Sequence, residues 1–268
     1  MTLSKGSYPG MMVQAPQKGN GVVDTSMMIN QVKSGDIRAI SRLISMVESG
    51  DLEAGAILEN LGPSTGQTET IGITGYPGVG KSTLVDRLAA AYRAEGKKVG
   101  ILAIDTSSPL TGGAILGDRI RMQSHSLDEE VYIRSLATRG HRGGLSQATS
   151  SAIRVLEAAG YDVVLIETVG VGQEEGEITT VAQTVVAVVA PGLGDEVQAM
   201  KAGLLEVAHL IVVNKADREG ADTTIRDLQG WVSQVVATVA LRGEGIGSVK
   251  EAIAAHQQQI RAASHANV

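Results

Sequence analysis

Short runs of aliphatic and β-branched residues recur along this chain, and stretches of helix or loop length separate one run from the next. The first run carries Ile71 and Ile73 alternating with smaller residues. The later runs are Val99–Ile104, Val163–Glu167, Thr184–Ala190, Leu210–Asn214 and Val235–Ala240. This alternation predicts an α/β fold, with a mostly parallel sheet covered by helices on both faces. In such sheets a ligand binds at the carboxyl ends of the strands.

The segment before the first strand has a different period. Over residues 26–61 apolar residues recur at three- and four-residue spacing, with breaks at Gly35 and Gly50, which predicts two or three short helices. Residues 1–25 are rich in Gly, Pro and Gln without an apolar period and are expected to be a disordered lead-in. The main domain then covers 69–268. The helical appendage either supports that domain or binds a partner, and both interpretations stay open.

A glycine-rich turn, GYPGVGKST, follows the first strand and leads into a helix. Gly75, Gly80, Lys81 and Ser82 occupy the fixed places of the phosphate-binding pattern G-x-x-x-x-G-K-[ST]. Glycines let successive backbone N–H groups curl around phosphate oxygens, while Lys81 reaches the β- and γ-phosphates and the Ser82 hydroxyl ligates Mg²⁺. The other nucleotide-binding positions are Gly78, Val79 and Thr83. A chance turn is the alternative, and the flanking strand and helix argue against it.

The motif Asn214-Lys215-Ala216-Asp217 follows the apolar run LIVV. A carboxylate at Asp217 can accept hydrogen bonds from N1–H and the exocyclic amine of guanine, while the Lys215 stem covers the ring face. Adenine has no N1–H and would leave that carboxylate unpaired. Ala240 and Leu241, which end the next run, are expected to offer backbone contacts to the guanine O6. An ordinary polar strand end is the alternative to guanine recognition.

A third group of residues fits sensing of the γ-phosphate and catalysis. Glu167 closes a strand and is expected to hold Mg²⁺ or its water, and the N–H of Gly170 can meet the γ-phosphate. Asp105 and Asp118 flank a glycine-containing loop from which both carboxylates can reach the metal. An ordinary solvated turn is the alternative for this loop. We assign catalytic roles to Lys81 together with three of these residues, Asp105, Glu167 and Gly170.

Composition narrows the picture further. The 268 residues include no Cys, which excludes disulfides, thiolate metal sites and a thiol nucleophile and suits a cytoplasmic location. The formal net charge of -6 leaves no basic footprint for nucleic acid. The longest apolar runs fall far short of the roughly 18 residues of a membrane span. We therefore expect neither nucleic acid nor a membrane as a partner.

The motifs GYPGVGKST, DTSSPLTGGAILGDRIRM, TRGHRGGLSQAT, ETVGVGQ, PGLGDEVQAMKAG and NKAD together closely resemble the MeaB/ArgK-type GTPases, the group that includes the methylmalonic aciduria type A protein. The resemblance implies a GTP-hydrolysing chaperone that gates cofactor delivery to, or protects, an adenosylcobalamin-dependent acyl-CoA mutase, with GTP or GDP and Mg²⁺ as ligands. It carries the P-loop, metal-side and base-reading roles over to the residues already named. It also implies a mobile loop at Pro191–Lys201, whose matching positions are Asp195, Glu196 and Lys201.

Val171 holds the place after Gly170 where a water-orienting Gln would be expected, and the nearest Gln is Gln173, which we group with the partner-sensing residues. Slow turnover without a partner is therefore expected. The chain departs from this family at Leu110, where the family commonly has Phe. The long C-terminal arm through which relatives dimerise does not follow Val268, so the oligomeric state is left open.

Other function classes compete with this one. A nickel metallochaperone GTPase shares the nucleotide fold but needs Cys or clustered His, and the five His residues here are dispersed. A partitioning ATPase would have a second Lys where this chain has Tyr76. A small-molecule kinase, as an older family label suggests, would yield a phosphorylated acceptor. A non-catalytic, nucleotide-regulated scaffold is the remaining alternative.

Overall fold

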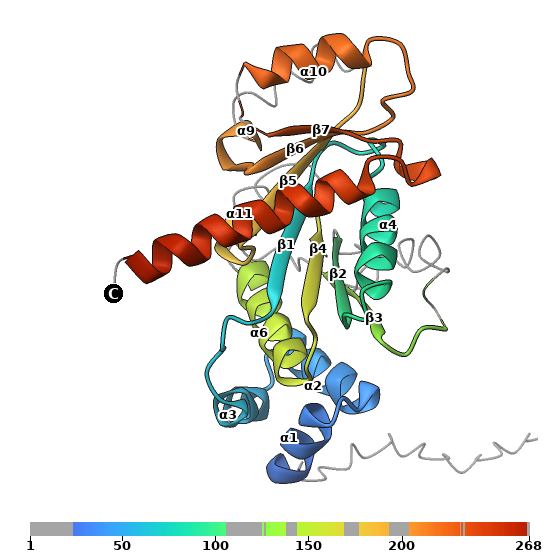
Figure 1. The fold of residues 1–268 in the computed structure, drawn as a ribbon. Coiled ribbons are helices and arrows are strands. Elements are labelled where there is room, and N and C mark those ends of the chain that lie inside the picture. Colours follow the sequence, from blue (N-terminus) through green and yellow to red (C-terminus); the bar gives the residue numbers. More distant parts are fainter. Residues whose placement is uncertain are drawn as a thin grey trace, which may run out of the picture.

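A seven-stranded sheet forms the centre of the protein (Figure 1). The computed structural model describes residues 24–105, 125, 127–137, 144–168, 177–192, 204–230, 232 and 234–266. The strands are β1 (Glu69–Thr74), β2 (Val99–Asp105), β3 (Val131–Ala137), β4 (Val163–Glu167), β5 (Thr184–Val189), β6 (Leu210–Val213) and β7 (Val235–Ala237). Their order is β3-β2-β4-β1-β5-β6-β7, and all six neighbouring pairs are parallel. The predicted α/β fold with a parallel sheet is confirmed.

Helices cover both faces of this sheet (Figure 1). They are α1 (Thr25–Lys33), α2 (Ile37–Ser49), α3 (Leu52–Leu61), α4 (Lys81–Arg93), α6 (Gly144–Ala158), α9 (Leu204–Val207), α10 (Ala221–Gln229) and α11 (Ile246–Ala266), with 3-10 turns η2 (Ile178–Thr180) and η3 (Ala240–Arg242). One hydrophobic cluster joins α1, α2, α3 and α6 to one face, and another joins α4 and α11 to the opposite face. A third, smaller cluster joins α10 to β5 and β6. The strands therefore contribute side chains to hydrophobic clusters on both faces of the sheet.

Strand β3 is absent from the runs that the hydrophobic pattern predicts. Its sequence VYIRSLA places polar side chains between apolar ones, and it lies at the edge of the sheet. Arg134 in this strand donates to the Ser45 hydroxyl at 2.9 Å and pairs with Glu48, both in α2. An edge strand that exchanges polar contacts with a covering helix does not need a continuous apolar run. Strand β7 also ends earlier than predicted, at Ala237, because the chain then turns into η3.

Three capped helices occupy the segment that the helical period marks. Asp24, Asp36 and Asp51 precede them, and each side chain accepts a hydrogen bond from a backbone N–H of the first turn. Gly35 and Gly50 have φ values of 81° and 71°, which a side chain would disfavour, so the chain turns where the pattern breaks. The helices share their hydrophobic cluster with α6 and the sheet. Most of the proposed lead-in, up to residue 23, lies outside the described residues.

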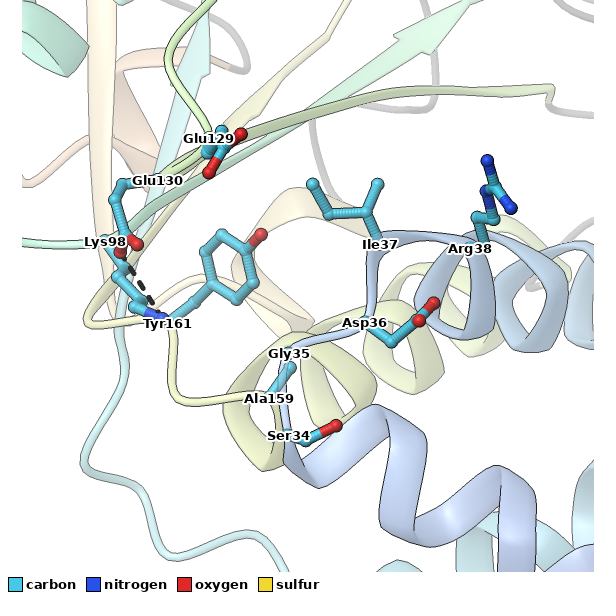
Figure 2. Close-up of a pocket in the computed structure, with 10 residues that line it drawn as sticks. All are labelled: Ser34, Gly35, Asp36, Ile37, Arg38, Lys98, Glu129, Glu130, Ala159 and Tyr161. Atoms are coloured by element: carbon cyan, nitrogen blue, oxygen red, sulfur yellow. Dashed lines mark ion pairs between the residues drawn. The ribbon is translucent and has the colours of Figure 1, made fainter.

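A cavity of about 500 Å³ opens at the amino edge of the sheet, where the turn between α1 and α2 meets the segments that lead into β2 and β3 (Figure 2). Lys98 and Glu130 form an ion pair of 3.3 Å on one side of it. The ring of Tyr161 extends into the space between that pair and Ile37. This edge is opposite to the one at which β1 enters the glycine-rich turn.

Candidate nucleotide site

The glycine-rich turn after β1 passes too close to other segments to carry side chains at two of its fixed positions. Gly75 has a φ of 137°, and a Cβ there would lie 2.1 Å from the carbonyl oxygen of Val188. Gly80 has a φ of 100°, and its Cβ would lie 2.3 Å from the Nδ2 atom of Asn214. Glycine at these positions is therefore required by the fold as well as by phosphate binding.

The first two residues of α4 carry the predicted phosphate and metal contacts. The Lys81 side chain is buried, and its Nζ donates to the carbonyl oxygens of Gly75 at 2.7 Å and Tyr76 at 3.2 Å. The Ser82 hydroxyl donates to the Oε1 atom of Glu167 at 2.7 Å. The fold thus brings Ser82 and Glu167 together, although 85 residues separate them in sequence.

Strand pairing explains how Glu167 reaches the turn. Ile73 in β1 lies beside Glu167 at the end of β4. The next residue, Thr168, donates its backbone N–H to the Ile73 carbonyl and its hydroxyl to the Thr74 hydroxyl, both at 3.0 Å. Sequence reasoning gave no role to these two threonines. Their contacts fix the point at which β4 leaves the sheet.

The oxygen atoms of Ser82 and Glu167 suit the binding of a hard cation. A hydroxyl and a carboxylate are oxygen donors of the kind that Mg²⁺ prefers, and their 2.7 Å contact holds both at one place. Asp105 ends β2, two residues past the position paired with Glu167. In the described ranges no group of three or more His, Cys, Asp or Glu side chains is arranged to hold a metal ion. The residues present fit a Mg²⁺ site that the nucleotide itself would help to complete.

Asn214 connects the segment after β6 to two other parts of the site. Its Nδ2 donates to the Val79 carbonyl at 2.8 Å. Its Oδ1 accepts from the Thr238 hydroxyl at 3.1 Å and from the Ala240 backbone N–H at 3.0 Å. The side chain is buried, so each of these bonds is protected from water. The N–H of Ala240 thus donates to Asn214 in this structure, and the expected contact of Ala240 with guanine stays a prediction.

Lys215 and Asp217 continue this segment toward solvent. Lys215 has a φ of 57°, a left-handed conformation that is unfavourable for a lysine, and its Nζ donates to the Gly78 carbonyl at 2.5 Å. The Asp217 carboxylate is 40% exposed and lies 3.4 Å from the Nη1 atom of Arg242. The strained backbone lays the lysine stem across the phosphate loop, and the carboxylate remains accessible beside it.

Several predicted site residues cannot be compared with the geometry. The side chain of Asp105 is not described. The residues that lie wholly outside the described ranges are Asp118, Gly170, Gln173, Asp195, Glu196 and Lys201. Their assigned roles stay predictions.

The fold and this site together define a P-loop GTPase. A crystal structure described as that of a LAO/AO transport system kinase has a TM-score of 0.67 at 28% identity, covering 89% of this chain and 76% of its own. A family model described as "Methylmalonyl Co-A mutase-associated GTPase MeaB" matches residues 40–267. The chain therefore belongs to the MeaB family, and the resemblance seen in its motifs is confirmed.

Named relatives agree with this assignment. A putative GTPase of Pyrococcus horikoshii is 50% identical over 244 residues, which are 86% of this chain and 77% of the relative. GTPase ArgK of Escherichia coli is 39% identical over 74% of this chain and 64% of its own. The methylmalonic aciduria type A homolog of Caenorhabditis elegans is 44% identical over 55% of this chain and 37% of its own. Within the described residues, no helix is long and apolar enough to cross a membrane.

Proposed function

We propose that this GTPase is a chaperone of an adenosylcobalamin-dependent acyl-CoA mutase, gating cofactor delivery to that enzyme or protecting it. The observation that carries the proposal is the match of residues 40–267 to a family described as associated with methylmalonyl-CoA mutase. The relative named as a methylmalonic aciduria type A homolog supports the same client class. We also propose that the protein is located in the cytoplasm.

The site residues divide the binding of GTP into two tasks. The backbone of the glycine-rich turn and Lys81 would hold the phosphates, while Asn214, Lys215 and Asp217 would read guanine. Mg²⁺ would be held by Ser82, Asp105, Asp118 and Glu167, and when bound it would neutralise charge on the β- and γ-phosphates. The buried bonds of Lys81 and Asn214 support this division, because they hold both side chains in defined positions beside the glycine-rich turn.

Hydrolysis is expected to be slow in the isolated protein. The water-orienting group has no obvious place in the sequence, since Val171 follows Gly170 and Gln173 comes two residues later. A bound mutase that places Gln173 beside the attacking water would supply this group. Acceleration of GTP hydrolysis by the client is therefore part of the proposal.

The test compares turnover and binding with and without a client. GTP hydrolysis is measured with and without a cobalamin-dependent acyl-CoA mutase from the same source, and mutase affinity is measured in GDP and in a non-hydrolysable GTP analogue. We expect faster turnover in the complex and an affinity difference of about 1 to 3 kcal/mol between the nucleotide states. Equal affinities together with unchanged turnover would contradict the chaperone proposal and leave a GTPase without this client.

Charge reversal tests the proposed partner-sensing loop. Lys201→Glu should reduce the acceleration by the mutase while basal GTP binding stays at the parental level, since Lys201 lies outside the phosphate and base motifs. Lys33→Glu, on the exposed end of α1, is the matched control for the change of charge. A phosphorylated small-molecule product in these reactions would favour the kinase alternative instead.

A further inference from the structure

Arg87 joins the helix after the phosphate loop to the turn that follows β7. It lies on α4, and its guanidinium contacts two consecutive carbonyl groups of η3. The Nε atom donates to the Ala240 carbonyl at 3.2 Å, and the Nη2 atom donates to the Leu241 carbonyl at 2.8 Å. Residues more than 150 positions apart are thereby held by one planar donor group.

Because the peptide bond is planar, a contact to a carbonyl group also restrains the N–H group of the same peptide unit. In a trans peptide the N–H points away from the carbonyl of the same unit. The carbonyl of Ala240 shares its peptide unit with the N–H of Leu241. The Ala240 carbonyl also accepts from the Gly243 N–H at 3.0 Å. Arg87 adds a second donor to this carbonyl and so further restricts the direction of the Leu241 N–H, which points away from α4.

The neighbouring backbone groups are already used. The Ala240 N–H donates to Asn214 at 3.0 Å, and the Arg242 N–H donates to the Val239 carbonyl at 2.9 Å. The turn is therefore held on one side by Asn214, which is bonded to the phosphate loop at Val79, and on the other by Arg87. Of the three N–H groups of Ala240, Leu241 and Arg242, that of Leu241 is the one without such a bond to Asn214 or Val239.

We propose that Arg87 is a positioning residue for base recognition, which aims the Leu241 N–H at the O6 atom of guanine. The inference rests on the proposed reading of guanine by the segment around Asp217. It divides that reading between two groups: Asp217 accepts from the N1–H and 2-amino group, and Leu241 donates to O6. Arg87 contributes to specificity without touching the nucleotide.

The exposure of Arg87 separates this role from a general contribution to stability. The residue is exposed, and within the described part of the chain its side-chain hydrogen bonds go to these two carbonyls. Exposed polar contacts contribute little to folding. Removing the guanidinium should therefore take away one of the two donors that orient this peptide unit, while the packing of α4 through Leu84, Val85 and Leu88 stays intact.

The experiment uses three diphosphates that differ at single positions of the base. GDP, inosine diphosphate and 6-thio-GDP are titrated into the parent, Arg87→Ala and Arg87→Lys. Inosine lacks the 2-amino group that Asp217 is proposed to read, and the sulfur of 6-thioguanine is a weaker acceptor than O6. Arg226→Ala is the matched control, because Arg226 lies on α10 and its hydrogen bonds stay within that helix.

Arg87→Ala should bind GDP up to about tenfold more weakly than the parent, and its preference for GDP over 6-thio-GDP should fall. The preference for GDP over inosine diphosphate should stay at the parental value. Arg87→Lys should be intermediate, since one ammonium can satisfy a carbonyl without the planar fork. The kcat at saturating GTP should change less than about twofold, because the phosphate contacts are retained.

Two other results would overturn the inference. Parental GDP affinity with an unchanged 6-thio-GDP penalty in Arg87→Ala would show that the contact does not position the base donor. Simultaneous loss of both base preferences, with a lowered melting temperature, would show a structural role only. Equal binding of GDP and ADP by the parent would instead remove the guanine assignment itself, so failure of the proposed function is distinguished from failure of the inference.

Discussion

The two edges of the sheet are built from different kinds of polar contact. At the carboxyl edge Lys81 and Asn214 are 7% and 3% exposed, and the Lys81 Nζ donates to the Gly75 carbonyl while the Asn214 Nδ2 donates to the Val79 carbonyl. At the amino edge the ion pair of Lys98 and Glu130 joins side chains that are each 41% exposed. Buried bonds fix geometry at a high cost of breaking them, whereas exposed pairs exchange readily with water. The carboxyl edge, with its buried bonds, is therefore the edge that is preorganised for chemistry.

The largest expected effect is at the carboxyl edge. Lys81→Ala should lower the rate of GTP hydrolysis by at least about 100-fold, because it removes the charge placed at the β- and γ-phosphates. Phosphate release at saturating GTP measures this. Lys97→Ala removes a lysine that pairs with Glu69 at the amino edge and is the matched control. Hydrolysis by Lys81→Ala at the parental rate would contradict the assigned role.

A second change tests base reading. Asp217→Asn should weaken GTP binding by about 100-fold, because an amide cannot accept from both guanine donors without presenting its own N–H groups. Xanthine nucleotides should gain affinity for the same variant, since their 2-oxo group can accept a hydrogen bond. Competition titrations measure both changes. Asp227→Asn, on the exposed side of α10, controls for the lost charge, and a loss of equal size there would oppose the assignment.

A pair of histidines at the amino edge should make the stability of the protein depend on pH. The rings of His209 and His256 lie 4.2 Å apart, His209 Nδ1 accepts from the Val185 N–H at 3.0 Å, and His256 Nδ1 lies 3.0 Å from the Thr184 hydroxyl. Burial lowers the pKa of both imidazoles, and the neighbouring ring lowers that of His256 further. Both are therefore expected to be neutral near pH 7.

The sign of the pH effect follows from these directions. Unfolded histidine binds its proton near pH 6.5, whereas the folded pair binds protons only at lower pH. The free energy of unfolding should therefore be steady above about pH 6.5, fall as the pH drops below it, and level off beneath the folded pKa values. Urea unfolding between pH 7.5 and 5 measures the curve. Replacing both residues, as His209→Gln with His256→Gln, should flatten it, and an unchanged slope would exclude the pair as its source.

The smallest effect is expected from the exposed pair beside the cavity in Figure 2. Lys98→Gln should lower the free energy of unfolding by less than about 1 kcal/mol and leave GTP affinity at the parental value. Chemical denaturation and nucleotide titration on the same preparation test both statements. A marked loss of GTP affinity would show that the amino edge is coupled to the site, which the exposure of the pair argues against.

The sequence predicts those parts of the molecule whose conformation is determined by the residue types within one short segment. The strand, glycine turn and helix around Lys81 follow from local residue types, and so do the helix breaks at Gly35 and Gly50. Strand β3 escapes prediction because its partners on α2 supply what an apolar run would otherwise provide. The contact of Arg87 with η3 could not be predicted, because its acceptors lie more than 150 residues away in the sequence and no local pattern identifies such an arginine.

The close approach of Gly80 to Asn214 has a consequence for which substitutions the protein can accept. A side chain at position 80 would collide with the Asn214 amide 2.3 Å away, so the phosphate loop and the base-reading segment share one small volume. The φ of 100° at position 80 disfavours any side chain there as well, so a smaller residue at 214 would not by itself admit a larger one at 80. Asn214 is also bonded to the phosphate loop at Val79, so a substitution made in one of these two segments disturbs the other.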